Sequence, residues 1–78
     1  MNVHEIKILY TYYKHVVSGA KKFEIRKNDR NYQVGDRVIM NCIDVENQPK
    51  VYGTISYITD YNQKDNYVVF SMRDIEVK

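Results

Sequence analysis

Residues 21–30 hold a concentration of charged side chains that could bind an anionic ligand or act on it. The five cations are Lys21, Lys22, Arg26, Lys27 and Arg30, and the two acids are Glu24 and Asp29. Five cations against two acids make this stretch net +3, whereas the whole chain is net +2 at pH 7. The basic character is therefore local, and contact with nucleic acid would have to come from a patch rather than from bulk charge.

Three residues of this stretch have the chemistry of a binding or catalytic site. Lys21 could bind a phosphate, polarise a carbonyl group, or act as a base if it were buried. Arg26 could recognise a phosphate or a base edge through two parallel hydrogen bonds. Because Arg26 favours the ionised form of Glu24, we interpret Glu24 as an acceptor for amino or hydroxyl groups rather than as a base. Lys21 and Glu24 are the catalytic candidates; the alternative is a solvated lysine beside a structural ion pair.

The residues after this trio could extend the site. Lys27, Arg30 and Arg37 would form a basic rim with salt-dependent affinity for RNA or DNA, or they are ordinary surface charges. Tyr32 could be a stacking platform for an unstacked base, or it could pack onto the end of the fold. The predicted ligand-binding set is Lys21, Glu24, Arg26, Lys27, Arg30 and Tyr32.

Other classes of site find no support in the sequence. His4 and His15 have no second ligand at metal spacing, so we expect no metal and no cofactor, and both are expected to be structural or exposed. The single cysteine, Cys42, excludes an internal disulfide and is expected to be an inert core thiol in a reducing compartment. No long apolar run or signal peptide is present, so we expect a cytoplasmic protein with no membrane partner.

The patterning predicts one early helix among short strands in a single domain, residues 1–78. A polar–apolar alternation predicts strands, and a three-to-four spacing predicts the helix. The expected strands are His4–Leu9, Lys21–Lys27, Arg37–Asp44, Val51–Thr59, Tyr67–Met72 and a short Ile75–Val77, and the expected helix is Tyr10–Ser18. Thr11 is a candidate N-cap, Gly19 would end the helix in a left-handed conformation, and Gly53 indicates a bulge or a close backbone approach.

Alternation also predicts how the second strand faces. Phe23 and Ile25 are expected to face the core, with Glu24 and Arg26 on the other side. Lys21 can join Glu24 and Arg26 only if the chain bends near Lys21 or Lys22. Because a small open sheet has exposed edges that promote aggregation, we predict closure into a mostly antiparallel β-barrel of five to six strands, of the α+β class but mostly β, with the helix at one end or side.

The spacing G-x-K-x-x-E-x-R, filled by Gly19, Lys21, Glu24 and Arg26, resembles the motif of the ASCH superfamily. The longer stretch KFEIRKNDR followed by VGD is similar to a short, uncharacterised ASCH-related family of bacteria and their phages. The resemblance is specific from His4 to about Asp36 and continues as a strand pattern through YVVFSMR. It implies a PUA-like barrel with a cleft beside the motif that binds RNA or modified nucleotides.

The resemblance also implies a possible activity. Some bacterial members are amidohydrolases that remove the acetyl group of acetylcytidine, and their catalytic lysine matches Lys21. Glu24 stands where those enzymes have threonine. Their further catalytic glutamate lies in a helical insertion before the last strand, and residues 60–66 leave no room for one.

Three hypotheses follow from the residues and the resemblance. The first is a non-enzymatic binding module for RNA or a modified nucleotide, with a basic cleft at the motif. The second is a small amidohydrolase on acetylated cytidine-type nucleosides. The third is a phage or bacterial module that binds another protein through its tyrosines and basic strand. The sequence leaves the ligand and the oligomeric state open.

Overall fold

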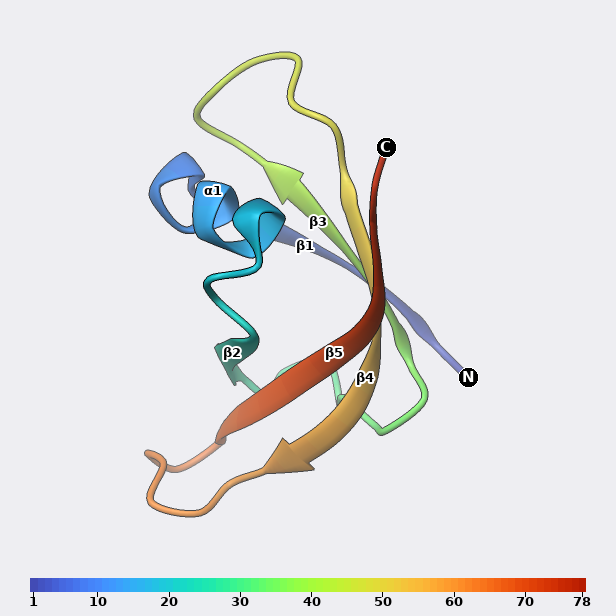
Figure 1. The fold of residues 1–78 in the computed structure, drawn as a ribbon. Coiled ribbons are helices and arrows are strands. Elements are labelled where there is room, and N and C mark those ends of the chain that lie inside the picture. The colour runs from blue at the N-terminus through green and yellow to red at the C-terminus, as the bar shows by residue number, and fades with distance from the viewer.

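The computed structural model describes residues 1–78 as five strands and one helix (Figure 1). The strands are β1 (Val3–Ile8), β2 (Phe23–Lys27), β3 (Arg37–Cys42), β4 (Val51–Thr59) and β5 (Tyr67–Val77), and the helix is α1 (Tyr10–Ser18). They form one sheet in the order β1-β3-β4-β5-β2. The β1–β3 pair is parallel and the other pairs are antiparallel. The mostly β class with one early helix is thus confirmed.

The sheet curls into a half-barrel, and its two edges, β1 and β2, do not pair through their backbones. Figure 1 shows α1 on the hollow side of the curved sheet, above β2. The predicted sixth strand is wrong, because Ile75–Val77 continue β5, which is 11 residues long. The predicted full closure is therefore replaced by an open seam between β1 and β2, partly filled by α1.

The core lies between the hollow face of the sheet and α1. Tyr13 and Val16 of the helix pack into it, and the Tyr13 hydroxyl donates a 2.7 Å hydrogen bond to the Pro49 carbonyl. The sheet and the Tyr32 loop supply the other buried apolar side chains, which are Ile6, Ile8, Tyr32, Val38, Met40, Val51, Ile55, Val68 and Phe70. Cys42 is partly buried and packs against this core. Burial of this cluster is the main force that holds the helix on the sheet.

Both ends of α1 are fixed, but only one in the predicted way. Gly19 has φ 84° and ends the helix in the left-handed conformation, as predicted. The predicted N-cap, Thr11, is wrong: Leu9 is at the cap position, and its side chain makes no capping bond. Instead, Asp44 Oδ1 accepts a 2.8 Å hydrogen bond from the Tyr10 N–H. A carboxylate from the β3–β4 connection thus satisfies an orphan donor of the helix.

Gly53 allows β4 and β5 to pack closely. A Cβ at this position would lie 2.9 Å from Met72 Sδ and 3.2 Å from Met72 Cβ. The pairing register between β4 and β5 also shifts between Tyr52 and Thr54. The predicted close approach and bulge are both confirmed.

A buried polar cluster anchors the beginning of β1 to the loop before β3. His4 Nε2 lies 2.7 Å from Asp36 Oδ2, and the backbone N–H groups of Asn2 and Gln33 each donate to the same carboxylate at 3.1 Å. The hydrogen bond from His4 holds the pKa of Asp36 below its ordinary value, with the two backbone donors adding to the effect. His4 is therefore structural, as predicted. We call these four residues the His4–Asp36 cluster.

Candidate ligand-binding cleft

The side chains of β2 face opposite to the prediction. Glu24 is only 3% exposed, whereas Phe23 and Ile25 are 50% and 53% exposed. The prediction that Phe23 and Ile25 enter the core is thus wrong. The physical reason is that Glu24 has charged partners that compensate its burial, so the acidic side chain can occupy the inner face.

Glu24 is held between two cations. Lys21 Nζ contacts Glu24 Oε2 and donates a second hydrogen bond, of 2.8 Å, to the Phe23 carbonyl. Arg26 approaches the other oxygen, Oε1, with Nε at 3.2 Å and Nη2 at 3.0 Å. Lys21, Glu24 and Arg26 therefore meet, as the motif suggested, and we call them the Glu24 trio.

The chain bends before β2, and this bend brings Lys21 to Glu24. Strand β2 begins only at Phe23, after the left-handed Gly19. The Lys21 N–H donates a 3.0 Å hydrogen bond to the His15 carbonyl, which folds the turn back onto α1. The bend that the sequence required near Lys21 is confirmed.

Arg26 also bridges the two edges of the sheet. Its Nη1 donates a 3.0 Å hydrogen bond to the Lys7 carbonyl, at the end of β1. Lys7 and Arg26 are 19 residues apart in the chain and lie on the two strands that do not pair. The Arg26 guanidinium thus bridges the two unpaired edge strands and also neutralises the charge of Glu24.

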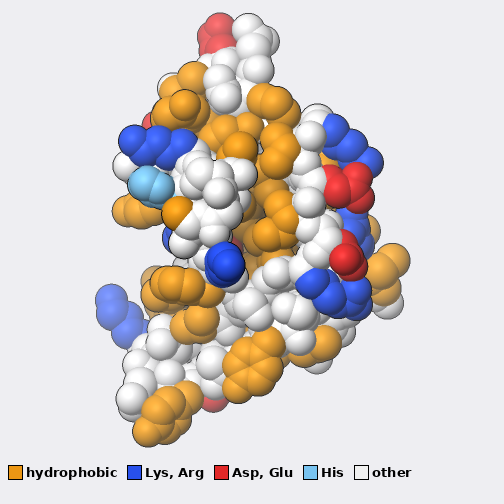
Figure 2. Space-filling view, viewed as in Figure 1, with side chains coloured by type: hydrophobic (Ala, Val, Ile, Leu, Met, Phe, Trp, Pro, Cys, Tyr) orange, Lys and Arg blue, Asp and Glu red, His pale blue; other side chains and the backbone are white.

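A cavity of about 470 Å³ lies along this seam. Five of its nine lining residues are hydrophobic; the whole lining is Lys7, Ile8, Leu9, Tyr12, Lys21, Phe23, Glu24, Ile25 and Arg26. Figure 2 shows the surface hollowed at the left of the view, between the side chains over α1 and those over β2. The volume falls within the range of small-molecule sites, about 300–1,000 Å³. We call this space the seam cavity.

The polar part of the seam cavity is rich in hydrogen-bond donors. A lysine ammonium has three N–H groups, and a guanidinium has five. Lys21 makes two hydrogen bonds to protein acceptors and Arg26 makes three. One N–H of Lys21 and two of Arg26 are therefore left for a ligand, and the surrounding walls are apolar and aromatic. Such a lining suits a flat, partly apolar molecule that carries acceptor atoms on one edge.

The remaining predicted site residues lie outside the seam cavity. Lys27 is exposed at the end of β2, and Arg30 is exposed in the following loop. Arg37 begins β3 and pairs with Val3, so it is at the opposite end of the β1–β3 pair from Lys7. These three cations can act only as distant charges for a small ligand in the cavity.

Tyr32 is not a stacking platform. It is buried, with its ring centroid 4.7 Å from that of His4 in an edge-on arrangement and 5.0 Å from that of Phe70. Burial is the main cause that raises the pKa of its hydroxyl. The stacking prediction is wrong, and the alternative, packing onto the end of the fold, describes the structure. At this end of the fold, the large ring of Tyr32 is more stable when packed in the apolar core than when exposed to solvent.

Sequence reasoning missed the walls of the seam cavity. The alternation assigns Phe23 and Ile25 to the core, and no motif points to Tyr12, Leu9 or Lys7. Alternation did place Phe23 and Ile25 on one face of the strand. The signal available in the sequence was therefore that this face could point outward instead of into the core. The sequence around Lys7–Leu9 does not indicate a cleft, because the position of this segment depends on the pairing of β1 with β3.

Two further observations limit the site. No helix of the structure is both long and apolar enough to cross a lipid bilayer. No three or more His, Cys, Asp and Glu side chains come together in a way that could hold a metal ion.

Comparison with known proteins places these features in a family. The model of the family described as "Domain of unknown function (DUF3850)" matches residues 3–72. The chain is also 36% identical over 70 residues to the "Uncharacterized 12.9 kDa protein in GpA 3'region" of Escherichia phage P2. That alignment covers 86% of this chain and 64% of the phage protein, so the chain spans less than two thirds of this relative. The residues matched by the family model include the Glu24 trio and every residue that lines the seam cavity. The chain therefore belongs to the DUF3850 family.

Proposed function

We propose that this protein is a binding module whose seam cavity takes one nucleotide unit, either of RNA or of a modified nucleotide. The observation that carries the proposal is the Glu24 trio: a buried carboxylate held between two cations, on the polar side of a cavity with aromatic walls. Phe23 and Tyr12 supply apolar rings against which a base can lie. The spare donors of Lys21 and Arg26 match the acceptor atoms on a base edge or a phosphate.

Charge supports the same ligand class. The cavity lining contains Lys7, Lys21 and Arg26 against Glu24 alone, a balance of three cations to one acid and so net +2. Low-dielectric walls strengthen this field inside the hollow, which favours a ligand that carries phosphate. Lys21 Nζ also lies 5.5 Å from the centroid of the Phe23 ring, so a cation–π contact helps to orient that wall.

We also propose that the family is part of the ASCH superfamily and that the half-barrel is a reduced PUA-like fold. The support is the G-x-K-x-x-E-x-R spacing, whose Lys21, Glu24 and Arg26 converge at the seam cavity. Those three residues are the ones through which the resemblance implied a ligand cleft.

Hydrolysis of acetylated cytidine-type nucleosides is the alternative, and the geometry supports it less well. The only carboxylate on the cavity wall is Glu24, and both of its oxygens accept hydrogen bonds from cations. A base must be able to take a proton from water or substrate. The β4–β5 connection, residues 60–66, contains no helix that would bring a second acid. We therefore propose binding without turnover.

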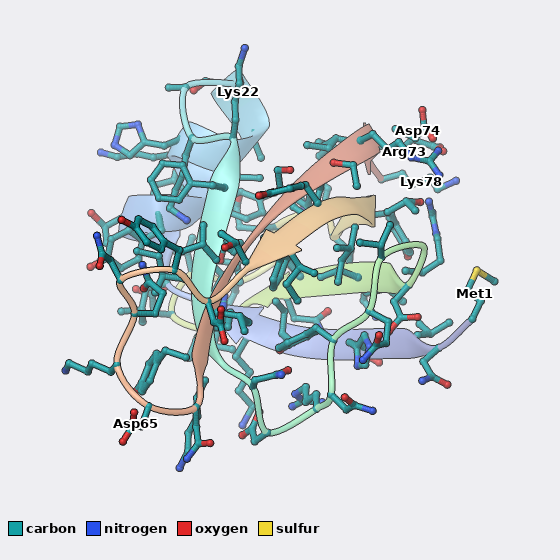
Figure 3. The ribbon with its side chains drawn as sticks, turned by 90° about the horizontal axis from the view of Figure 1, so that it is seen from below. Met1, Lys22, Asp65, Arg73, Asp74 and Lys78 are labelled. Carbon is teal, nitrogen blue, oxygen red and sulfur yellow. The ribbon has the colours of Figure 1, made fainter.

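The first test is a thermal-shift screen of nucleosides, nucleotides and short RNAs. A ligand that binds only the folded protein must raise its melting temperature. With nucleosides and mononucleotides, we expect a shift for the wild type and for Lys22→Ala, and none for Lys21→Ala. Lys22 is the matched control because it projects away from the body of the protein, beside Lys21 in the chain (Figure 3).

A second variant separates binding from folding, since Lys21→Ala leaves Glu24 with one partner fewer. Phe23→Ala removes an exposed wall of the cavity and leaves the Glu24 trio intact. We expect it to abolish the shift while the melting temperature without ligand stays within a few degrees. If the thermal shift persists in Phe23→Ala, the ligand binds outside the cavity. No shift with any nucleotide or RNA would refute the proposal in favour of a protein partner, and release of acetate from acetylcytidine would establish the hydrolase.

A further inference from the structure

The charge of the chain is divided sharply between two parts. Residues 6–28 contain a single acid, Glu24, and six cations, which are Lys7, Lys14, Lys21, Lys22, Arg26 and Lys27. The other 55 residues contain the remaining six cations and nine acids. The first part is net +5 and the second is net −3, which together give the +2 of the whole chain. A small overall charge therefore conceals a strongly basic part.

The basic part is also continuous in space, because it forms the elements around the seam cavity. It comprises the end of β1, all of α1, the turn at residues 19–22 and β2. Its only acid is buried and neutralised, so the exposed charge of these elements is positive throughout. Figure 2 shows Lys and Arg side chains both above and below the hollow. We call the six cations of residues 6–28 the basic face.

The acids lie on other elements. Asp60 and Asp65 are on the β4–β5 loop, and Asp74 and Glu76 are on the C-terminal half of β5. Figure 3 shows Asp65 at the lower left and Asp74 at the right, both far from Lys22 at the top. Two exposed acids adjoin the basic part: Asp44, whose Oδ1 accepts a 2.8 Å hydrogen bond from the Tyr10 N–H, and Asp29, in the loop after β2. Glu5, on β1, pairs with Lys50 at 3.4 Å. An anionic polymer is thus attracted to the basic face and repelled by the rest of the surface.

We infer that the ligand of the seam cavity is one unstacked base of a single-stranded nucleic acid, whose neighbouring phosphates lie on the basic face. This inference rests on the proposed function and names its partner. A free nucleotide explains Lys21 and Arg26 but gives no role to Lys14, Lys22 and Lys27, which do not line the cavity. Lys27 is four residues beyond Phe23 along β2, about 13 Å at the rise of a strand. That distance calls for a ligand longer than one nucleotide.

The shape of the cavity favours a single strand over a duplex. A base within a helix is stacked and paired, and it can enter a recess only after it is flipped out, which costs a few kcal/mol. The walls that receive it, Phe23, Ile25 and Tyr12, line a hollow instead of protruding. A lipid surface would need apolar side chains that project outward. Tyr12 and Val17 of α1 are 52% and 43% exposed, so the test below includes lipid vesicles.

The test compares two double variants that lose the same charge. Lys14→Gln with Lys22→Gln removes two cations of the basic face outside the cavity. Lys64→Gln with Lys78→Gln removes two cations from the acidic remainder. Binding is followed by the fluorescence anisotropy of a labelled single-stranded RNA of about 10 nucleotides, within the usual site size, across a salt series. AMP, CMP, GMP and UMP serve as single-nucleotide ligands in parallel.

We expect the basic-face double variant to bind the RNA at least about 10-fold more weakly at low salt. Its slope of log K against log salt should fall by about 1.4, since each phosphate contact on a single strand contributes about 0.7. The control double variant should change affinity less than about 2-fold, the scale of a remote surface charge. Neither variant should alter binding of a mononucleotide in the cavity.

Other results would overturn the inference in distinguishable ways. Equal affinity for RNA and mononucleotide, unchanged by the basic-face variant, would refute the polymer and leave the proposed function standing. No binding of either would refute both. If duplex DNA competes as well as single-stranded RNA does, the inference of a single strand is refuted. If the basic-face variant loses binding to phosphatidylserine–phosphatidylcholine vesicles to the same extent as binding to RNA, the basic face is assigned to a membrane. Comparison of RNA with DNA of the same sequence decides whether the 2′-hydroxyl contributes.

Discussion

Glu24 and Asp36 are two equally buried carboxylates on different elements of the same fold, and they are satisfied in different ways. Each is 3% exposed. Asp36 accepts hydrogen bonds from two backbone N–H groups and from His4, whose side chain is itself 7% exposed. Glu24 accepts only from the side chains of Lys21 and Arg26, which are 23% and 25% exposed. The partners of Asp36 are fixed in the core, whereas those of Glu24 reach in from the surface.

The difference separates a carboxylate whose partners are fully used from one whose partners keep spare hydrogen-bond donors. Ionised carboxylates only accept hydrogen bonds, so His4 must present Nε2–H to Asp36 and the cluster is complete without a ligand. The cations beside Glu24 keep unused N–H groups and border a cavity. Burial alone therefore does not distinguish a site from an anchor; the freedom and spare hydrogen-bonding capacity of the partners do.

The largest predicted effect is on stability, at Asp36. Asp36→Ala leaves His4 and two backbone N–H groups buried without an acceptor. We expect the free energy of unfolding to fall by about 3–5 kcal/mol, as for a broken buried pair, measured by urea denaturation. Ligand affinity should be unchanged wherever the variant is folded. If Asp36→Ala does not fold, Asp36→Asn can be measured in its place. Because it keeps the shape of the side chain, we expect Asp36→Asn to fold and to lose less than about 3–5 kcal/mol.

Glu24→Gln should have a smaller effect on stability and a larger one on binding. Lys21 and Arg26 can turn toward water when the carboxylate charge is removed, because both are partly exposed. We expect a loss of about 1–2 kcal/mol in the free energy of unfolding, and nucleotide affinity reduced about 10-fold or more through loss of the ordered donors. A stability loss as large as that of Asp36→Ala would abolish the distinction between the two carboxylates.

Acid should act on Asp36 in a specific range of pH. Its pKa is lower in the folded protein than the ordinary value of 3.8. The stability that it contributes is therefore complete above about pH 3.8 and is lost as the pH falls through the lowered folded-state pKa. Urea denaturation from pH 6 to pH 2 should show the advantage of the wild type over Asp36→Asn shrinking in this range.

One control is needed for this titration. Glu5 also has a lowered pKa, caused mainly by the hydrogen bond from Asn41 and then by Lys50, so Glu5→Gln should be measured in parallel. An advantage of the wild type over Asp36→Asn that stays constant down to pH 2 would contradict the assignment to Asp36.

The smallest predicted effect tests the bridge across the seam. Arg26→Lys keeps the positive charge but cannot reach Glu24 and the Lys7 carbonyl together. We expect a loss of about 1 kcal/mol or less in the free energy of unfolding, since the site is partly exposed. Amide exchange near the ends of β1 and β2 should become faster, while exchange in β4 should not. Unchanged exchange at the seam would show that the bridge does not restrain these edges.

The sequence predicted most elements from local spacing, and the resemblance implied that Lys21, Glu24 and Arg26 meet if the chain bends near Lys21 or Lys22. The helix Tyr10–Ser18 and the strand Val51–Thr59 have the predicted bounds. The convergence of Lys21, Glu24 and Arg26 followed from the motif and from the bend that Gly19 permits. Such features need no knowledge of distant partners.

The errors share one physical cause. Alternation shows that Phe23 and Ile25 lie together but not which side of the strand is buried, and the choice was made by Lys21 reaching around to Glu24. The cap of α1 comes from Asp44, 34 residues away from Tyr10. The burial of Tyr32 depends on His4 and Phe70. Each outcome was decided by a side-chain contact that periodicity does not report, across three residues at Glu24 and between remote parts of the chain at α1 and Tyr32.

The strand order has a consequence for how the protein is made. Residues 21–26 leave the ribosome early, but β2 hydrogen-bonds only to β5, with Phe23 opposite Ser71, 48 positions later. Until that last strand has been synthesised, Lys21, Glu24 and Arg26 have no sheet on which to assemble. A nascent chain stalled before Tyr67 thus contains every residue that lines the seam cavity but lacks the strand on which β2 assembles.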